Sequence, residues 1–466
     1  MATLPSVSYS ITIRLELDDG HGSAVGSLTN AVEHVGGVIT ALDVASAGHE
    51  RIRIDVTCAA RDTDHAQTIV DALGAVEGVH VHKVSDRTFL MHLGGKIEMK
   101  SKVSLRNRDE LSMAYTPGVA RVSQAIAANR DDARRLTIKR NSVAVVTDGS
   151  AVLGLGNIGP EAAMPVMEGK AALFKRFADI DAWPIALDTQ DADEIVRTVQ
   201  VLAPGFGGIN LEDISAPRCF EIEARLRELL DIPVFHDDQH GTAIVVLAAL
   251  KNALRVVGKE LSEVRITMSG AGAAGTAILK LLMHAGAKDV IVCDVHGAVH
   301  SDRDDLDPNL RWIADNTNPA AYCGDLKGAV SGADVFIGVS APNILSGEDI
   351  AEMNDDSIIF ALANPEPEVD PEVAHLHAAV VATGRSDYPN QINNVLVFPG
   401  VFRGLLDAQS RHVDSDMMVA AAEALADVVT DDELGPHYII PSVFHTDLSQ
   451  QVASAVRDTA LRGRPE

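Results

Sequence analysis

One stretch of about 30 residues constrains the fold more than any other part of the chain. It begins with the strand-like run 264–269, turns through a glycine-spaced motif at 270–275 and enters an apolar helical pattern over 273–284. A second strand-like run, 289–293, ends on Asp294. This order is that of a βαβ unit whose glycines permit a tight turn and bring the backbone close to a pyrophosphate at the helix N-terminus. The stretch therefore predicts a bound dinucleotide.

The glycine turn is predicted to contact the pyrophosphate of the cofactor, and Asp294 is predicted to contact its ribose. Asp294 can accept hydrogen bonds from ribose hydroxyls, and its carboxylate would repel a 2′-phosphate, which favours NAD. NADP stays open as the alternative, because a neighbouring Lys or Arg would offset that charge. Further strand-like runs at 334–340, 357–363 and 378–382 extend the unit into a doubly wound α/β sheet. The residues assigned to the pyrophosphate turn are Gly270, Gly272, Ala273, Ala274 and Gly275.

A second glycine-spaced motif lies earlier in the chain, at 154–159. It follows the strand-like run 143–147, but an Asp-Gly turn intervenes and Pro160 comes directly after it. The next strand-like run arrives too late for an ordinary dinucleotide unit. We interpret this segment as a loop that shapes the active site, and a second nucleotide site is the alternative.

The first 85 or so residues are organised differently. Residues 9–17 alternate strictly between apolar and polar side chains, as in a strand with one buried face. A helical pattern, two more strand-like runs (38–44 and 51–58), a second helix (about 64–73) and a last strand (79–84) follow. This βαββαβ order is the ferredoxin-like unit. In order and size the segment resembles an ACT domain, a small module that often binds amino acids or other effectors between paired copies. A dimerisation module without a ligand is the alternative.

Charge excludes some classes of partner. Lys and Arg number 39 against 66 Asp and Glu, for a net charge of −27. Such a chain repels nucleic-acid backbones and anionic lipid. The longest apolar run, 243–250, is far shorter than the ~20 residues that span a bilayer. The four cysteines show neither a CxxC pair nor disulfide-framework spacing. We therefore expect a cytoplasmic protein with no nucleic-acid or membrane partner.

Two acid-rich segments, 210–214 and 235–242, each follow an apolar run or a proline and place carboxylates at predicted strand ends. Carboxylates without cysteine ligands suit a hard cation such as Mg²⁺ or Mn²⁺. Adjacent residues of a strand point to opposite faces, so Glu212 and Asp213 can share an ion only if the strand ends in a turn there. The segment 215–217, Ser-Ala-Pro, predicts that turn. Solvated acids on an acidic protein are the alternative interpretation.

Together with other segments, in this order, the two acid-rich runs resemble the malic enzyme family over about residues 90–450. The resemblance implies oxidative decarboxylation of (S)-malate to pyruvate and carbon dioxide, with NAD as oxidant and a divalent cation. The segments that carry it are YTPGVA (115–120), TDGSAVLGLGNIGP (147–160), EGKAALF (168–174), NLEDI (210–214), HDDQHGTA (236–243), GAGAAG (270–275), ANPEPE (363–368) and NNVLVFPGVFRG (393–404).

The resemblance also implies roles for single residues. Lys170 corresponds to the base that takes the C2 hydroxyl proton of malate, and Tyr115 to the acid that protonates C3. A lysine acts as a base near neutral pH only when burial or a nearby positive charge lowers its pKa. Ala151 and Val152 stand where the larger family members carry an arginine, so another group must hold malate. The implied metal ligands are Glu212, Asp213 and Asp238, with Asp237 hydrogen-bonded close by as a catalytic residue. The residues implied to contact nicotinamide or substrate are Asn364, Asn393 and Asn394.

The predicted domains are an ACT-like regulatory domain (1–88), a substrate and metal domain (89–240), a Rossmann-like NAD-binding domain (241–400) and a C-terminal helical tail on the catalytic core (401–466). The expected partners are malate, a small effector at the ACT-like domain and further copies of the chain, as a dimer or larger homo-oligomer. Two alternatives remain. One is an effector-regulated 2-hydroxy-acid or amino-acid dehydrogenase without decarboxylation, and the other is a catalytically silent metabolite sensor.

Overall fold

The computed structural model describes residues 5–18, 24–47 and 51–463. It divides into two compact units, Met1–Met99 and Lys100–Glu466. Each unit has a hydrophobic core of its own. We describe them separately as unit 1 and unit 2.

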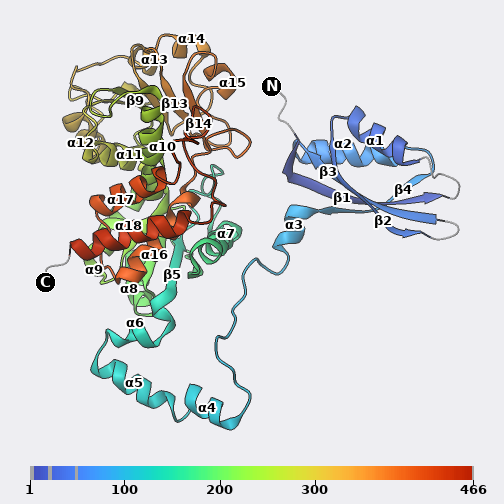
Figure 1. The fold of residues 1–466 in the computed structure, drawn as a ribbon, viewed down its shortest axis with the longest axis horizontal. Helices are drawn as coiled ribbons and strands as arrows, with labels where there is room; N and C mark the ends of the chain where they lie inside the picture. Colours follow the sequence, from blue (N-terminus) through green and yellow to red (C-terminus); the bar gives the residue numbers. More distant parts are fainter. Residues whose placement is uncertain (1–4, 19–23, 48–50, 464–466) are drawn as a thin grey trace. The chain divides into compact units, whose positions relative to one another are not determined.

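Unit 1 is a four-stranded antiparallel sheet of order β2-β3-β1-β4 with helices α1 and α2 between its strands and a short helix α3 after the last strand. The alternation in the first strand is confirmed over residues 11–17, because Ile11, Ile13, Leu15 and Leu17 are buried in the core. It is wrong at the start of the strand, where Tyr9 is exposed and Ser10 is buried. The predicted βαββαβ order is also confirmed (Figure 1). A regulatory role for this unit stays a prediction. The elements are β1 (Ser6–Asp18), α1 (Ala24–His34), β2 (Val38–Ala47), β3 (Arg51–Ala60), α2 (Thr63–Gly74), β4 (Val79–Asp86) and α3 (Arg87–His92).

Unit 2 contains two parallel sheets, and the first has the order β6-β5-β7-β8. Every residue of its strands β5, β7 and β8 is buried, as the apolar runs predict. The carboxyl ends of β7 and β8 lead directly into the two acid-rich segments. The elements are β5 (Ser142–Thr147), α7 (Pro160–Ala178), β6 (Asp181–Ala186), α8 (Ala192–Leu202), β7 (Gly208–Leu211), α9 (Arg218–Leu229) and β8 (Val234–His236).

The second sheet has the order β11-β10-β9-β12-β13-β14, parallel except for the short edge strand β11. This is the predicted doubly wound sheet, and α11 occupies the helical pattern that follows the glycine turn. The elements are β9 (Arg265–Ser269), α11 (Ala273–His284), β10 (Asp289–Asp294), β11 (Gly297–Ala298), α12 (Pro308–Asn316), α13 (Leu326–Val330), β12 (Val335–Gly338), α14 (Gly347–Ala351), β13 (Ile358–Ala361), α15 (Pro371–Ala374) and β14 (Val380–Thr383).

Helix α10 (Thr242–Val257) and the C-terminal helices join the two sheets through one continuous core. Phe174 of α7 packs edge-on against Phe398 and Phe402, with ring centroids 4.7 and 5.3 Å away. By length and composition the helical stretch Asp237–Val257 could cross a membrane, a result that the short apolar run did not predict. Because 67% of its most apolar window is buried inside the protein, it has the burial of a core helix. The C-terminal elements are α16 (Phe398–Ala408), α17 (Ser415–Ala426) and α18 (Leu448–Arg462).

Two helices of unit 2, α4 (Arg108–Ala114) and α5 (Val119–Ala128), project away from the sheets (Figure 1). We call residues 108–128 the arm. Helix α4 packs on α5, and α5 packs on the short helix α6 (Asp132–Leu136). Every residue of the arm is exposed or half-buried, including its apolar side chains.

Candidate active site

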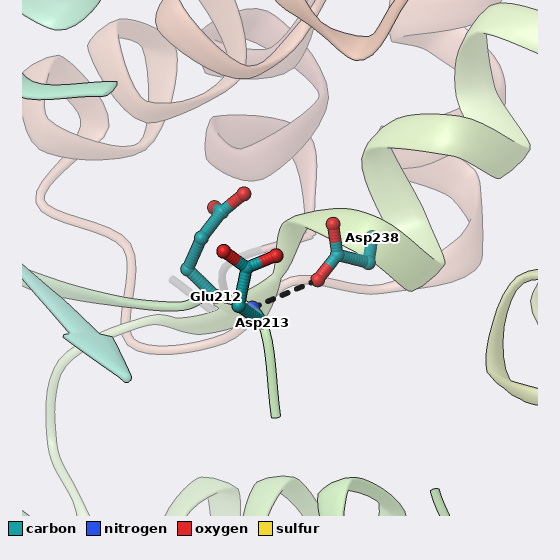
Figure 2. Close-up of side chains that lie close together, drawn as sticks. All are labelled: Glu212, Asp213 and Asp238. Atoms are coloured by element: carbon teal, nitrogen blue, oxygen red, sulfur yellow. Dashed lines mark hydrogen bonds between the residues drawn. The ribbon is translucent and has the colours of Figure 1, made fainter. Parts of the chain in front are cut away.

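Three carboxylates converge at the carboxyl ends of β7 and β8 (Figure 2). Strand β7 ends at Leu211, and Asp213 takes a left-handed backbone conformation (φ 54°). This is the predicted turn, and it lets consecutive residues serve one site. The Asp213 backbone N–H donates to Asp238 Oδ2 over 3.0 Å. One oxygen each from Glu212, Asp213 and Asp238 lies within 4.8 Å of the other two.

The electrostatics of this cluster fit a divalent cation. Burial and the neighbouring Asp238 raise the pKa of Asp213 to about 7, and burial also raises that of Glu212 well above its ordinary value. Asp213 Oδ2 is buried and has no hydrogen-bond partner among the described residues. Like charges that are held together away from water are relieved by a cation that binds between them. Glu212, Asp213 and Asp238 are therefore the residues that would hold Mg²⁺ or Mn²⁺.

Lys170 lies in the interior of α7, with 7% of its surface exposed. Its Nζ is 2.5 Å from Asp237 Oδ2 and 2.9 Å from Glu212 Oε1. The same nitrogen stands 4.3 Å from the centroid of the Phe398 ring. Burial disfavours the ammonium ion, as expected, but the carboxylates of Asp237 and Glu212 outweigh that effect and raise the pKa of Lys170 above its ordinary value. The expected lowering of this pKa is therefore wrong for the residues of the chain alone, because the charges beside Lys170 are negative. Lys170 and Asp237 therefore form a buried pair that can hold and pass a proton.

Two residues around the cluster escaped the sequence analysis. Asn210 is fully buried and donates from Nδ2 to Glu212 Oε2 over 2.8 Å, which fixes that carboxylate. Arg218 follows the Ser-Ala-Pro turn, and its Nη2 is 2.8 Å from Asp148 Oδ2 and 3.1 Å from Ser150 Oγ. Its guanidinium lies beside the loop that contains Ala151 and Val152, whose side chains cannot bind a malate carboxylate. The only sequence signal for Arg218 was its position after the turn.

The glycine turn before α11 is as tight as the sequence predicts. Gly270 has φ +114°, and a Cβ on Gly275 would lie 1.9 Å from the Gly270 carbonyl oxygen. Asp294 ends β10, but it is not an isolated charge. Arg303 Nη1 and Nη2 are 2.9 and 2.8 Å from its two carboxylate oxygens. Arg303 is thus the neighbouring cation that the sequence analysis left open.

The three asparagines occupy segments next to these elements. Asn364 follows β13 and is exposed, with Nδ2 donating to the Leu362 carbonyl oxygen over 3.3 Å. Asn393 accepts from the Val395 backbone N–H at the start of the short helix η4 (Asn394–Leu396). Asn394 lies close to Gly241, where an added Cβ would be 3.2 Å from the Asn394 Cβ. Their roles toward nicotinamide and substrate stay predictions.

Tyr115 stands apart from this cluster in the chain's own fold. It caps the C-terminal end of α4 on the arm, and 68% of its surface is exposed. Figure 1 shows α4 and α5 projecting away from the sheets that carry the carboxylates and Lys170. Tyr115 can therefore act at this site only if the arm that carries it comes from another copy of the chain.

A doubly wound sheet of the dinucleotide-binding type, joined to a carboxylate cluster with a buried lysine, defines a class: the metal-assisted dehydrogenases. Comparison with known proteins narrows it. The family model of the malic enzyme N-terminal domain matches residues 94–227, and that of the malic enzyme NAD binding domain matches residues 239–461. The chain belongs to the malic enzyme family.

Individual relatives agree with this assignment. The chain is 55% identical over 462 residues to the NAD-dependent malic enzyme of Geobacillus stearothermophilus, a match over 99% of this chain and 96% of that protein. It is 52% identical over 387 residues to the bifunctional malic/malolactic enzyme of Bacillus subtilis, over 83% and 92% of the two chains. The crystal structure of the NAD-dependent malic enzyme of Thermotoga maritima matches with a TM-score of 0.77 and 48% identity, over 80% of this chain and 99% of that one.

Proposed function

We propose that this chain catalyses the oxidative decarboxylation of (S)-malate to pyruvate and carbon dioxide, with reduction of NAD and dependence on Mg²⁺ or Mn²⁺. The observation that carries the proposal is the distance of 2.9 Å between Lys170 Nζ and Glu212 Oε1. It places the amine that we assign as the base directly beside the cluster that would hold the cation and the substrate oxygens. The name of the Geobacillus relative, an NAD-dependent malic enzyme, supports it. We place the reaction in the cytoplasm, because the four cysteines are free.

Bound NAD supplies the hydride acceptor, and a bound divalent cation supplies Lewis-acid stabilisation of negative charge on the substrate oxygens. Lys170 Nζ accepts the C2 hydroxyl proton while the C2 hydride leaves, which yields oxaloacetate. For this step Nζ must first lose its own proton. Asp237 Oδ2, at 2.5 Å, is the acceptor within reach, and burial raises the pKa of its carboxyl group.

The second half of the reaction needs a proton donor. The C3–C4 bond breaks, C4 leaves as carbon dioxide and the electron pair stays on the enolate of pyruvate. We assign the proton that C3 then receives to the Tyr115 hydroxyl, as the family resemblance implies. The overall change converts malate and NAD⁺ into pyruvate, carbon dioxide and NADH, and it balances because the proton that Lys170 takes from the C2 hydroxyl replaces the one that Tyr115 gives to C3.

An assay of purified protein with L-malate tests the proposal. We expect NADH absorbance and carbon dioxide to rise in equal amounts with Mg²⁺ or Mn²⁺ present, and both to vanish with a chelator. A 2-hydroxy-acid dehydrogenase without decarboxylation would keep its NADH signal without carbon dioxide. A silent sensor would bind NAD and give neither product. Either outcome would contradict the proposed reaction.

We further propose that the active enzyme is a homo-oligomer in which the arm of one copy covers the active site of another. The apolar side chains of the arm include Leu111 and Met113, exposed by 49% and 70%. The loop between β5 and α7 also presents Leu153 and Leu155, exposed by 66% and 69%. Exposed apolar surface of this extent is typical of an interface. Burying the two surfaces against each other would bring Tyr115 of one copy to Lys170 of the other.

Mixing inactive subunits tests this arrangement. Lys170→Ala and Tyr115→Phe should each be nearly inactive alone, because each removes a proton-transfer group. If the arm is shared between two copies, mixed dimers contain one site with both native side chains, and an equal mixture should recover about one quarter of the parent activity. The measurement is the malate-dependent rate of the co-expressed mixture, and doubly tagged mixed dimers purified from it should reach about one half of the parent activity. Recovery that stays at the level of the single variants would show that both groups act within one chain.

A further inference from the structure

Arg303 is held between two carboxylates just beyond β10. Its Nη1 and Nη2 donate to the two oxygens of Asp294 over 2.9 and 2.8 Å. On the other side, Nε donates to Asp305 Oδ1 over 2.8 Å and Nη2 to Asp305 Oδ2 over 2.6 Å. All three guanidinium nitrogens are therefore occupied. The Arg303 side chain is 9% exposed, whereas that of Asp305 is 48% exposed.

This cluster lies beside the turn that would carry a dinucleotide. The Gly270 backbone N–H donates to the Cys293 carbonyl oxygen over 2.9 Å, so the residue before Asp294 touches the glycine turn. In a doubly wound fold, an acid at this strand end faces the adenosine ribose. Whatever surrounds Asp294 therefore sets the charge at the ribose 2′ position.

The charge balance at this position depends on Asp305. Hydrogen bonds from Arg303 lower the pKa of Asp305 to about 2, and its bonds to both acids raise the pKa of Arg303, so the charges persist at physiological pH. Two carboxylates and one guanidinium leave one net negative charge. Without Asp305, the pair of Asp294 and Arg303 would be neutral. The Nε edge of the guanidinium would also be free, and this edge geometry suits a phosphate.

We propose that Asp305 is a specificity-determining residue that selects NAD over NADP by occupying the free edge of Arg303. The inference rests on the proposed dinucleotide-dependent function and adds a residue outside the glycine motif to it. Asp294 alone does not determine the choice, because Arg303 neutralises it in a bidentate pair. Asp305 removes the cation that a 2′-phosphate would otherwise find. His296 Nε2 lies 4.0 Å from Asp305 Oδ2, so this imidazole also faces that carboxylate.

Asp305→Asn, compared with Asp304→Asn, tests the inference. Asp304 is also exposed, and its replacement removes the same formal charge one residue away. Dissociation constants for NADP and NAD are measured by fluorescence titration with the reduced cofactors, without malate or metal. For Asp305→Asn we expect NADP affinity to rise about tenfold, the scale of one freed charge-assisted contact, while NAD affinity stays within about threefold. Asp304→Asn should leave both unchanged.

A double variant tests whether the Arg303 guanidinium is the group that binds the 2′-phosphate. Arg303→Gln combined with Asp305→Asn should lose the gain in NADP affinity, because the guanidinium that would bind the phosphate is absent. Equal gains in NADP affinity for Asp305→Asn and Asp304→Asn would overturn the inference. A gain that persists when Arg303→Gln is added would overturn it too. Neither result would contradict the proposed reaction. If the parent protein binds neither cofactor, the proposed function and this inference fall together.

Discussion

Lys170→Ala should lower kcat for malate oxidation by about 10²- to 10⁴-fold, the range for loss of a general base. The reason is positional. In the described structure Lys170 Nζ is the cationic nitrogen placed 2.5 Å from Asp237 and 2.9 Å from Glu212. Affinity for NAD should stay within a few-fold of the parent, since the glycine turn lies on the other sheet. The measurements are steady-state kinetics with Mn²⁺ and an NADH titration.

Lys175→Ala is the matched control for that experiment. Lys175 lies on the same helix, but its side chain is half-exposed and pairs with Asp179 and Asp181. The control should keep kcat within about twofold, because Lys175 pairs with acids outside the carboxylate cluster. It should also keep its stability, because exposed ion pairs contribute little to the free energy of unfolding. Lys170→Ala also removes a buried cation from acidic neighbours, so the thermal stability of each variant is measured alongside. Turnover of Lys170→Ala near the control value would refute its assignment as the base.

Asp213→Asn should abolish metal-dependent stabilisation. At a Mn²⁺ concentration of about 100 times its Kd, the parent gains about 2.7 kcal/mol of unfolding free energy from binding, and the variant should lose most of that gain. Without metal, the order of stability of the two proteins should reverse. The variant should then unfold at a higher temperature than the parent, because one of the three crowded carboxylates has become neutral. Thermal unfolding with Mn²⁺ and with a chelator measures both effects.

The same site makes the metal-free parent sensitive to pH. Asp213 has a pKa of about 7 when folded, against an ordinary value of 3.8, so the folded state holds a proton that the unfolded state has lost. This contribution to stability is present at acid pH and disappears as pH rises from about 4 to about 7. Asp213→Asn should remove the Asp213 part of that pH dependence and leave the part due to Glu212, whose pKa is also raised. Asp193→Asn, an exposed acid on α8 paired with Arg225, is the control and should preserve it. If Mn²⁺ stabilises the Asp213→Asn variant against unfolding as much as it stabilises the parent, Asp213 is not a ligand.

Much of the fold could be predicted because its signals are local. The alternation in β1 follows from side chains that point to opposite faces of a strand, and it marked the buried face of unit 1 correctly. The glycine spacing at 270–275 follows from a turn that tolerates no Cβ, and α11 spans Ala273–His284 as the helical pattern predicts. The acid-rich segments were predicted at strand ends for the same reason, since an apolar run that stops at a carboxylate marks the edge of a buried sheet.

The sequence by itself determined which residue types stand at the ends of which strands, because secondary structure and turns depend on neighbours along the chain. It also identified the carboxylates and the lysine as candidates. Only the tertiary structure decided their surroundings: Arg303 and Asp305 around Asp294, Asn210 behind Glu212, and the exposure of Tyr115 on the arm. Charge and hydrogen bonding act through space over a few ångströms, so these properties depend on side chains that only the packed sheets and loops bring together.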